Sequence, residues 1–286
     1  MDSKLTVKDF KNLICRELNS IYSLKEILSI YSILLENRVN ISKVEAALYP
    51  EKVIESQQLL EDLKRLKKAE PIQYIVGVAP FRNLELRVTP DTLIPRPETE
   101  ELVELIVSDP TLNKRNHLQI LDIGTGTGAI AISLKQKFPE ADLYATDFSI
   151  RALQVAKANA EKYRLKVNWI HHDILRDPVE ILPQSVDLIV SNPPYIPELN
   201  APMLHANVTQ YEPHSALFVP NYDPLLFYKR IIDIGSIILK PDGKLFFETF
   251  EESQESMMQL LKSYKYKNVH FINDINEKFR FLIASL

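Results

Sequence analysis

Three of the six glycines in this 286-residue chain fall together, at Gly124, Gly126 and Gly128. They follow an apolar segment at 118–122 and precede a helical pattern that begins at Ala129. Glycine lets the backbone turn tightly and lets a ligand approach without a Cβ in the way, and the start of a helix adds unpaired N–H groups. The spacing therefore predicts a ligand-binding loop rather than a simple connection between two elements.

Two acidic residues beside this loop indicate which ligand it suits. Asp147 ends the next predicted strand, where a carboxylate can accept hydrogen bonds from both ribose hydroxyls of a nucleoside. Asp122 precedes the loop, where its charge suits a cationic amino group and disfavours a pyrophosphate. Residues 124–129 also fit the Gly-x-Gly-x-x-Ala fingerprint of dinucleotide-binding proteins, so a dinucleotide stays an alternative ligand.

A second segment, Asn192-Pro193-Pro194-Tyr195, directly follows the apolar run 186–191. Two consecutive prolines restrict the backbone and remove two N–H donors. The Asn192 side-chain oxygen and the Pro193 carbonyl can then converge on one NH₂ group of an amide or a nucleobase, on which the Tyr195 ring can stack. Two such acceptors raise the electron density on a nitrogen whose lone pair is delocalised, and they hold it in line with an electrophile. The sulfonium methyl of S-adenosylmethionine is the electrophile that suits the glycine loop.

Alternating elements must position both segments. From residue 118 onward, short β patterns alternate with helical patterns, and the clearest of these helices spans 150–163. This order predicts an α/β fold, namely a Rossmann-like, mostly parallel sheet with helices on both faces. The predicted strands are 118–122, 142–146, 167–171, 186–191, 244–248, 269–272 and 279–284. Because ligands bind at the carboxyl ends of such strands, we expect the two segments to share one site.

The first part of the chain has a different pattern. Apolar residues recur at helical spacing through 1–70, which predicts a small all-α domain. Residues 72–76 and 84–88 have the short β pattern of a hairpin. We therefore expect three parts: a helical domain at 1–70, a hairpin linker at 71–92 and a catalytic domain at 93–286.

Composition excludes several classes of protein. The single cysteine, Cys15, rules out an internal disulfide and a multi-cysteine metal site, and we expect no metal. No apolar run approaches the roughly 20 residues of a membrane span. The net charge of −4 argues against a protein that mainly coats nucleic acid. The expectation is a cytoplasmic protein with no membrane contact and no direct contact with nucleic acid.

These segments resemble the class I S-adenosylmethionine-dependent methyltransferases, and more specifically the protein-(glutamine-N5) methyltransferases of class-1 peptide chain release factors. The resemblance covers nearly the whole chain. It includes the helical domain and the segments 70–77, 93–100, 122–128 and 192–195. The Leu-Ile-Pro-Arg-Pro-Glu-Thr-Glu sequence of segment 93–100, beside a helical domain, is the most specific of these features.

The resemblance implies methyl transfer from S-adenosylmethionine, with S-adenosylhomocysteine as product, to the glutamine amide nitrogen of the release factor's Gly-Gly-Gln motif. It implies that the helical domain helps to dock the release factor. The cofactor contacts that it implies are Gly124, Thr125, Gly126, Thr127, Gly128, Asp147, Asp173, Ile174 and Asn192. By the same resemblance, Asn192, Pro193 and Tyr195 act in catalysis, and these three bind the substrate together with Pro194 and Arg96. Arg96 has a second interpretation, a salt bridge that fastens the hairpin to the catalytic domain.

Three positions depart from the family pattern. Asn83 in the hairpin turn and Phe250 after a strand stand where relatives commonly have glycine, and Ile174 stands where many have an aromatic residue. We expect Asn83 to take the left-handed conformation of the turn, since asparagine tolerates it best after glycine. Two alternative functions stay open: an N6-adenine or N2-guanine methyltransferase of DNA or RNA, and a non-catalytic module that binds a nucleotide-type ligand.

Overall fold

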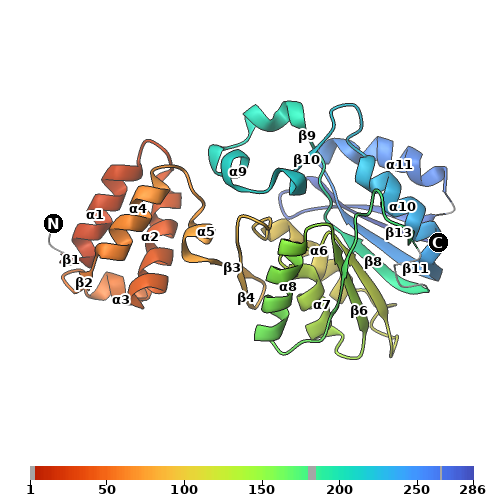
Figure 1. Ribbon diagram of the computed structural model, residues 1–286, viewed down its shortest axis with the longest axis horizontal. Coiled ribbons are helices and arrows are strands. Elements are labelled where there is room, and N and C mark those ends of the chain that lie inside the picture. The colour runs from red at the N-terminus through yellow and green to blue at the C-terminus, as the bar shows by residue number, and fades with distance from the viewer. Residues whose placement is uncertain (1–3, 180–184, 265) are drawn as a thin grey trace. The chain divides into compact units, whose positions relative to one another are not determined.

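The computed structural model describes residues 4–179, 185–264 and 266–286, which form two compact units (Figure 1). Unit 1 comprises Met1–Val78 and the short segment His205–Tyr211, and unit 2 comprises Ala79–Leu204 and Glu212–Leu286. The segment His205–Tyr211 is thus far in sequence from the rest of its unit. No helix in the described ranges is both long enough and apolar enough to cross a membrane.

Unit 1 is a helical bundle with one short pair of strands. Its elements are β1 (Lys4–Thr6), α1 (Val7–Leu18), α2 (Leu24–Val39), α3 (Lys43–Leu48), β2 (Val53–Glu55), α4 (Gln57–Leu66), α5 (Ile72–Val76) and α9 (Ala206–Tyr211). The antiparallel pairing of β1 with β2 was not predicted from the sequence. A capping box starts α2, because Ser23 accepts from the Glu26 N–H while the Glu26 side chain accepts from the Ser23 N–H.

The inner faces of these helices enclose an apolar core that includes Phe10, Leu34 and Leu59. Two contacts fasten the segment that contains α9 to this unit. The Tyr211 hydroxyl donates to the Lys68 carbonyl at 2.8 Å, and the rings of Tyr22 and His205 lie 6.1 Å apart.

Two sequence predictions about the hairpin were wrong. Residues 72–76 form helix α5 and not a strand, since Pro71 stands at its start and Gly77 ends it with a φ of 83°. The hairpin strands are β3 (Val78–Phe81) and β4 (Leu84–Arg87). In its turn, Arg82 and not Asn83 takes the left-handed conformation, with a φ of 52°.

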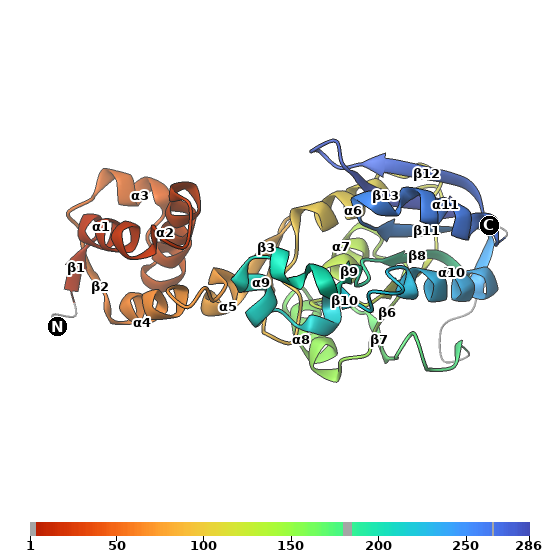
Figure 2. The ribbon, with the colours of Figure 1, turned by 90° about the horizontal axis from the view of Figure 1, so that it is seen from above.

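Unit 2 is built on a seven-stranded sheet of mostly parallel strands, which confirms the predicted α/β class. The strands are β5 (Gln119–Ile123), β6 (Asp142–Asp147), β7 (Asn168–His171), β8 (Val186–Ser191), β11 (Leu239–Glu248), β12 (Lys267–Asn273) and β13 (Phe279–Ser285). Their order is β12-β13-β11-β8-β5-β6-β7. Figure 2 labels β12, β13, β11, β8, β6 and β7 in this order from the top of the view to the bottom. Strand β13 runs antiparallel to both of its neighbours, β11 and β12. The strand order reverses between β5 and β8, because β6 and β7 lie on one side of β5 and β8 and β11 on the other.

Helices cover both faces of this sheet, because successive strand residues face opposite sides. In β5, Ile120 belongs to a core with α6 (Pro97–Val107) and α7 (Ala129–Lys137), whereas Leu121 belongs to a core with α10 (Leu226–Ile238) and α11 (Gln254–Lys262). Helix α8 (Ile150–Lys162) lies beside β6, β7 and the hairpin. Short elements complete the unit: β9 (Ile196–Pro197), η2 (Glu198–Met203), η3 (His214–Ala216), β10 (Phe218–Val219) and η4 (Glu251–Ser253).

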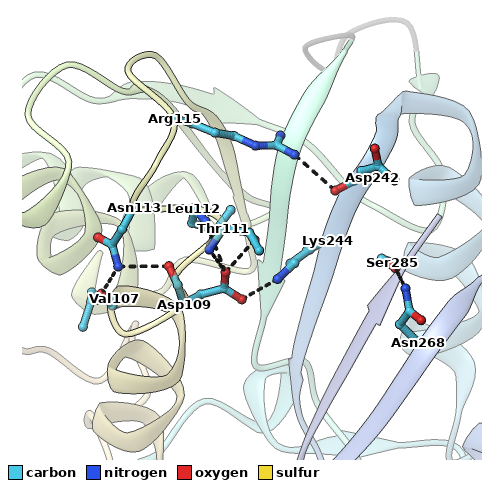
Figure 3. A network of polar contacts seen from close by, with 10 residues as sticks. All are labelled: Val107, Asp109, Thr111, Leu112, Asn113, Arg115, Asp242, Lys244, Asn268 and Ser285. Carbon is cyan, nitrogen blue, oxygen red and sulfur yellow. Dashed lines mark hydrogen bonds and ion pairs between the residues drawn. The ribbon is translucent and has the colours of Figure 1, made fainter.

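Helix α6 is fastened to β11 at both of its ends. Beyond its carboxyl end, Asp109 accepts from the Thr111 and Leu112 N–H groups and pairs with Lys244 of β11 (Figure 3). At its amino end, Thr99 donates to Glu248, the last residue of β11. The helix therefore runs antiparallel to the strand and holds its first turn beside the carboxyl edge of the sheet.

Candidate active site

A cavity of about 370 Å³ lies at the carboxyl edge of the sheet, within unit 2. The strand register explains which residues meet there, because Ile123 pairs with Ser191 across β5 and β8, and with Thr146 across β5 and β6. The glycine loop and the Asn-Pro-Pro-Tyr segment begin immediately after these paired residues. The two predicted segments therefore lie side by side at the point where the strand order reverses.

The glycine loop is held by the backbone of β6. The N–H groups of Gly124 and Thr125 both donate to the Thr146 carbonyl at 2.9 Å. Gly124 and Gly126 have φ values of 75° and 54°, and a Cβ on either would meet no atom within 4 Å. Both glycines line the cavity, so the open space beside them is available to a ligand.

Gly128 differs from the other two glycines, because packing and not a ligand fills its surroundings. A Cβ there would lie 3.1 Å from the Ala156 and Ile132 side chains. Thr127 is also tied down, since its carbonyl accepts from Asn159 of α8 at 2.9 Å. Asn159 bonds Arg87 of the hairpin as well, so it joins the hairpin to the glycine loop.

Asp147 lines the cavity at the end of β6 and is 8% exposed. Its Oδ2 accepts from the Gly126 N–H and its Oδ1 from the Ser149 N–H, each at 2.9 Å. Burial raises the pKa of this carboxyl. These two backbone bonds fix the carboxylate in one orientation at the cavity wall.

Asp122 is fully buried below the glycine loop. Its Oδ2 accepts from the Thr125 hydroxyl at 2.6 Å. Burial raises the pKa of this carboxyl to about 7. Asp122 does not line the cavity, so its carboxyl supports the loop from inside through Thr125.

Asp173 and Ile174 line the cavity beyond β7. The Asp173 side chain accepts from the Leu175 N–H at 3.0 Å, and Ile174 is buried in the core beside α10. They place one carboxylate and one apolar side chain at this end of the cavity.

Asn192, Pro193 and Pro194 line the cavity beside the glycine loop. The Asn192 Nδ2 atom donates to the Thr99 hydroxyl at 3.1 Å. Since Thr99 receives the amide NH₂ group, the acceptor oxygen of Asn192 is the part that remains for a ligand.

Tyr195 and Arg96, two other predicted site residues, are not among the residues that line the cavity. The Tyr195 ring stacks on Phe250, with ring centres 5.7 Å apart, and burial raises its pKa to about 12. Arg96 pairs with the buried carboxylate of Glu212, which also accepts from the Ile94 N–H at 3.3 Å. The Arg96 ion pair therefore holds the segment after Tyr211 and does not reach the hairpin.

Sequence reasoning missed much of the apolar cavity wall. The missed residues are Leu93, Phe148, Leu175, Ser215, Ala216, Phe218, Pro220, Leu226, Phe227 and Ile231. Phe148 and Leu175 follow predicted site residues directly, so their proximity was a usable signal. The residues from 215 to 220 carry no motif. They include β10, which pairs with β9 just after Tyr195 and so lies near the cavity.

Comparison with known proteins shows relatives along the whole chain. Residues 103–210 match the family model of the methyltransferase small domain, and residues 14–77 match that of the PrmC N-terminal domain. A release factor glutamine methyltransferase of Flavobacterium psychrophilum is 40% identical over 95% of this chain and 96% of its own length. One from Bacteroides thetaiotaomicron is 45% identical over 77% of this chain and 78% of its own.

A methyltransferase structure from Pyrococcus furiosus shares the fold. It has a TM-score of 0.51 and 17% identity, over 80% of this chain and 95% of that one. The extent of the sequence identity, together with the matched N-terminal domain, shows that the chain belongs to the release factor glutamine methyltransferase family.

Proposed function

We propose that the protein transfers a methyl group from S-adenosylmethionine to the side-chain amide nitrogen of the glutamine in the Gly-Gly-Gln motif of class-1 peptide chain release factors. The observation that carries this proposal is the register of β5 and β8, which sets the acceptor atoms of residues 192–193 beside the glycine loop in one cavity. The names of the curated relatives supply the substrate class. We place the reaction in the cytoplasm, where release factors act.

The cavity residues fit this cofactor. Asp147 offers a fixed carboxylate to ribose hydroxyls, and Ile174 offers an apolar surface to a base. The open space beside Gly124 and Gly126 suits the amino-acid part. Bound there, S-adenosylmethionine supplies a methyl group on a positively charged sulfur.

Asn192 and Pro193 activate and orient the glutamine nitrogen that receives the methyl group. Their oxygens accept the two hydrogens of the glutamine NH₂ group, which shifts electron density onto a nitrogen that is otherwise a poor nucleophile. They also fix the direction of its approach, which lowers the entropic part of the barrier. Methylation of the nitrogen would leave S-adenosylhomocysteine as the second product, and the nitrogen would lose one of its two hydrogens to water as a proton.

The test uses the purified full-length protein, a labelled methyl donor and a release factor with an intact Gly-Gly-Gln motif. We expect label on the release factor, and tandem mass spectrometry should place one methyl group on that glutamine. A release factor whose glutamine is replaced by asparagine is the matched control and should stay unlabelled. Parallel reactions with DNA and RNA test the alternative substrates, and label there but not on the release factor would overturn the proposal.

A further inference from the structure

Behind the cavity wall, a chain of buried hydrogen bonds ends on Asn192. The Asn192 Nδ2 atom donates to the Thr99 Oγ1 atom at 3.1 Å, and the Thr99 hydroxyl donates to Glu248 Oε2 at 2.6 Å. Thr99 is 6% exposed and Glu248 is 3% exposed. Neither lines the cavity, so each reaches a ligand only through Asn192.

The chain has a fixed direction. The direction holds while Glu248 is ionised, because a carboxylate then only accepts hydrogen bonds, and a hydroxyl has a single hydrogen to donate. Since Thr99 gives that hydrogen to Glu248, its oxygen must accept from Asn192. A flipped Asn192 amide would point its oxygen at the Thr99 oxygen and at the Glu248 carboxyl, with acceptors facing acceptors.

The positions of these residues follow from the fold. Thr99 is in the first turn of α6 and Glu248 ends β11, which lies next to β8 in the sheet. Phe247 pairs with Ser191, so the residues that follow them, Glu248 and Asn192, are neighbours. Burial raises the pKa of Glu248 to about 7, which reflects the cost of enclosing this carboxyl in the core.

We propose that Thr99 and Glu248 are positioning residues that fix the orientation of the Asn192 carboxamide, so that its oxygen and not its NH₂ group faces the glutamine amide. The inference rests on the proposed function. An Asn192 amide turned the other way would point its own NH₂ group at the NH₂ group of the glutamine. The glutamine nitrogen would then lose one of its two hydrogen bonds.

Two replacements of Thr99 separate this role from packing. Thr99→Val keeps the shape and removes the hydroxyl. We expect kcat for release-factor methylation to fall roughly tenfold, because the free energy of one hydrogen bond corresponds to about that ratio of rates. Thr99→Ser keeps the hydroxyl and should restore kcat to within about twofold of the original. Cofactor affinity, measured by calorimetry, should be unchanged in both variants. Ser133→Ala, which removes a buried hydroxyl of α7 that has no partner in the described residues, is the control for a general loss of buried polarity.

A double-mutant cycle gives the decisive readout. In an Asn192→Ala background, followed with labelled methyl donor at high enzyme concentration, Thr99→Val should cause no further loss, because Thr99 acts through Asn192. An equal loss in both backgrounds, or a failure of Thr99→Ser to restore kcat, would overturn the inference.

Glu248→Gln provides a second route if Thr99→Val folds poorly. It keeps the shape but adds a donor, so the Thr99 hydroxyl can turn either way. We expect kcat to fall several-fold, because the Thr99 hydrogen bond is weakened and not lost. In the Asn192→Ala background, Glu248→Gln should cause no further fall. Absence of release-factor methylation by the unmodified protein would refute the proposed function, whereas normal methylation by Thr99→Val would refute only the positioning role.

Discussion

At the glycine-loop end of the cavity, residues of the adjacent strand β6 hold the site, whereas at the Asn192 end side chains from distant parts of the sequence hold it. Gly124, Thr125 and Gly126 are fixed by Thr146 and Asp147 of the neighbouring strand. Asn192 is fixed by Thr99, 93 positions away, which in turn bonds Glu248, 149 positions from it. The cofactor end is therefore set by local sequence, and the acceptor end by how α6 and β11 pack together.

This difference predicts that the two ends can be damaged separately. The largest effect should follow Asn192→Asp, which replaces the NH₂ donor with a carboxylate beside Glu248. Methyl transfer should fall at least about a hundredfold, as is typical when a group aimed at the reacting centre is lost. The check is the single-turnover rate with a saturating labelled cofactor, and a rate within tenfold of the original would contradict the role given to this amide.

Gly126→Val should damage the other end. The new side chain would occupy the open space beside the loop in a left-handed backbone conformation that β-branched residues avoid. We expect the calorimetric Kd for S-adenosylmethionine to rise at least about tenfold. Gly77→Ala is the matched control, since Gly77 has a φ of 83° and similar open space but ends α5 in unit 1. It should cost stability and leave the Kd unchanged, and equal Kd values for all three proteins would count against the loop as the cofactor site.

Each end also buries one acid whose pKa is raised by burial to about 7, Asp122 at the cofactor end and Glu248 at the acceptor end. The folded protein keeps these protons to a higher pH than the unfolded chain does, so the free energy of unfolding should fall as the pH rises from 5 to 7. The slope is at most about 1.4 kcal/mol per pH unit for each group. Denaturant unfolding at several pH values should show a flatter dependence in Asp122→Asn and in Glu248→Gln, and unchanged slopes in both variants would contradict the assignment.

The smallest effect should come from Phe250, which stacks on Tyr195 at the acceptor end. Phe250→Ala removes an aromatic contact of about 1 kcal/mol, so KM for the release factor should rise a few-fold while the cofactor Kd stays constant. Phe271→Ala is the control, because it breaks the Phe271–Phe279 pair on β12 and β13. An equal change of KM in both variants would mean that the Tyr195–Phe250 stack has no specific part in substrate binding.

The same contrast explains what could be predicted from the sequence. Periodicity and short motifs identified the sheet, the glycine loop and residues 192–194 at the cavity, because these depend on neighbours in the sequence. Residues 72–76 were misread because their apolar content outweighed the helix boundaries marked by Pro71 and Gly77. The pairing of β1 with β2 and the Thr99–Glu248 contact join segments far apart in the chain, and no local pattern encodes them.

Titration calorimetry of S-adenosylmethionine into Asn192→Ala, with methyl transfer followed on the same protein, tests the central claim that the two ends are separate. We predict a Kd within about threefold of the unmodified protein, about 0.6 kcal/mol, because the glycine loop and the Asp147 carboxylate stay in place. Transfer to the release factor should be lost. A cofactor Kd that rises in step with the loss of transfer would contradict the claim.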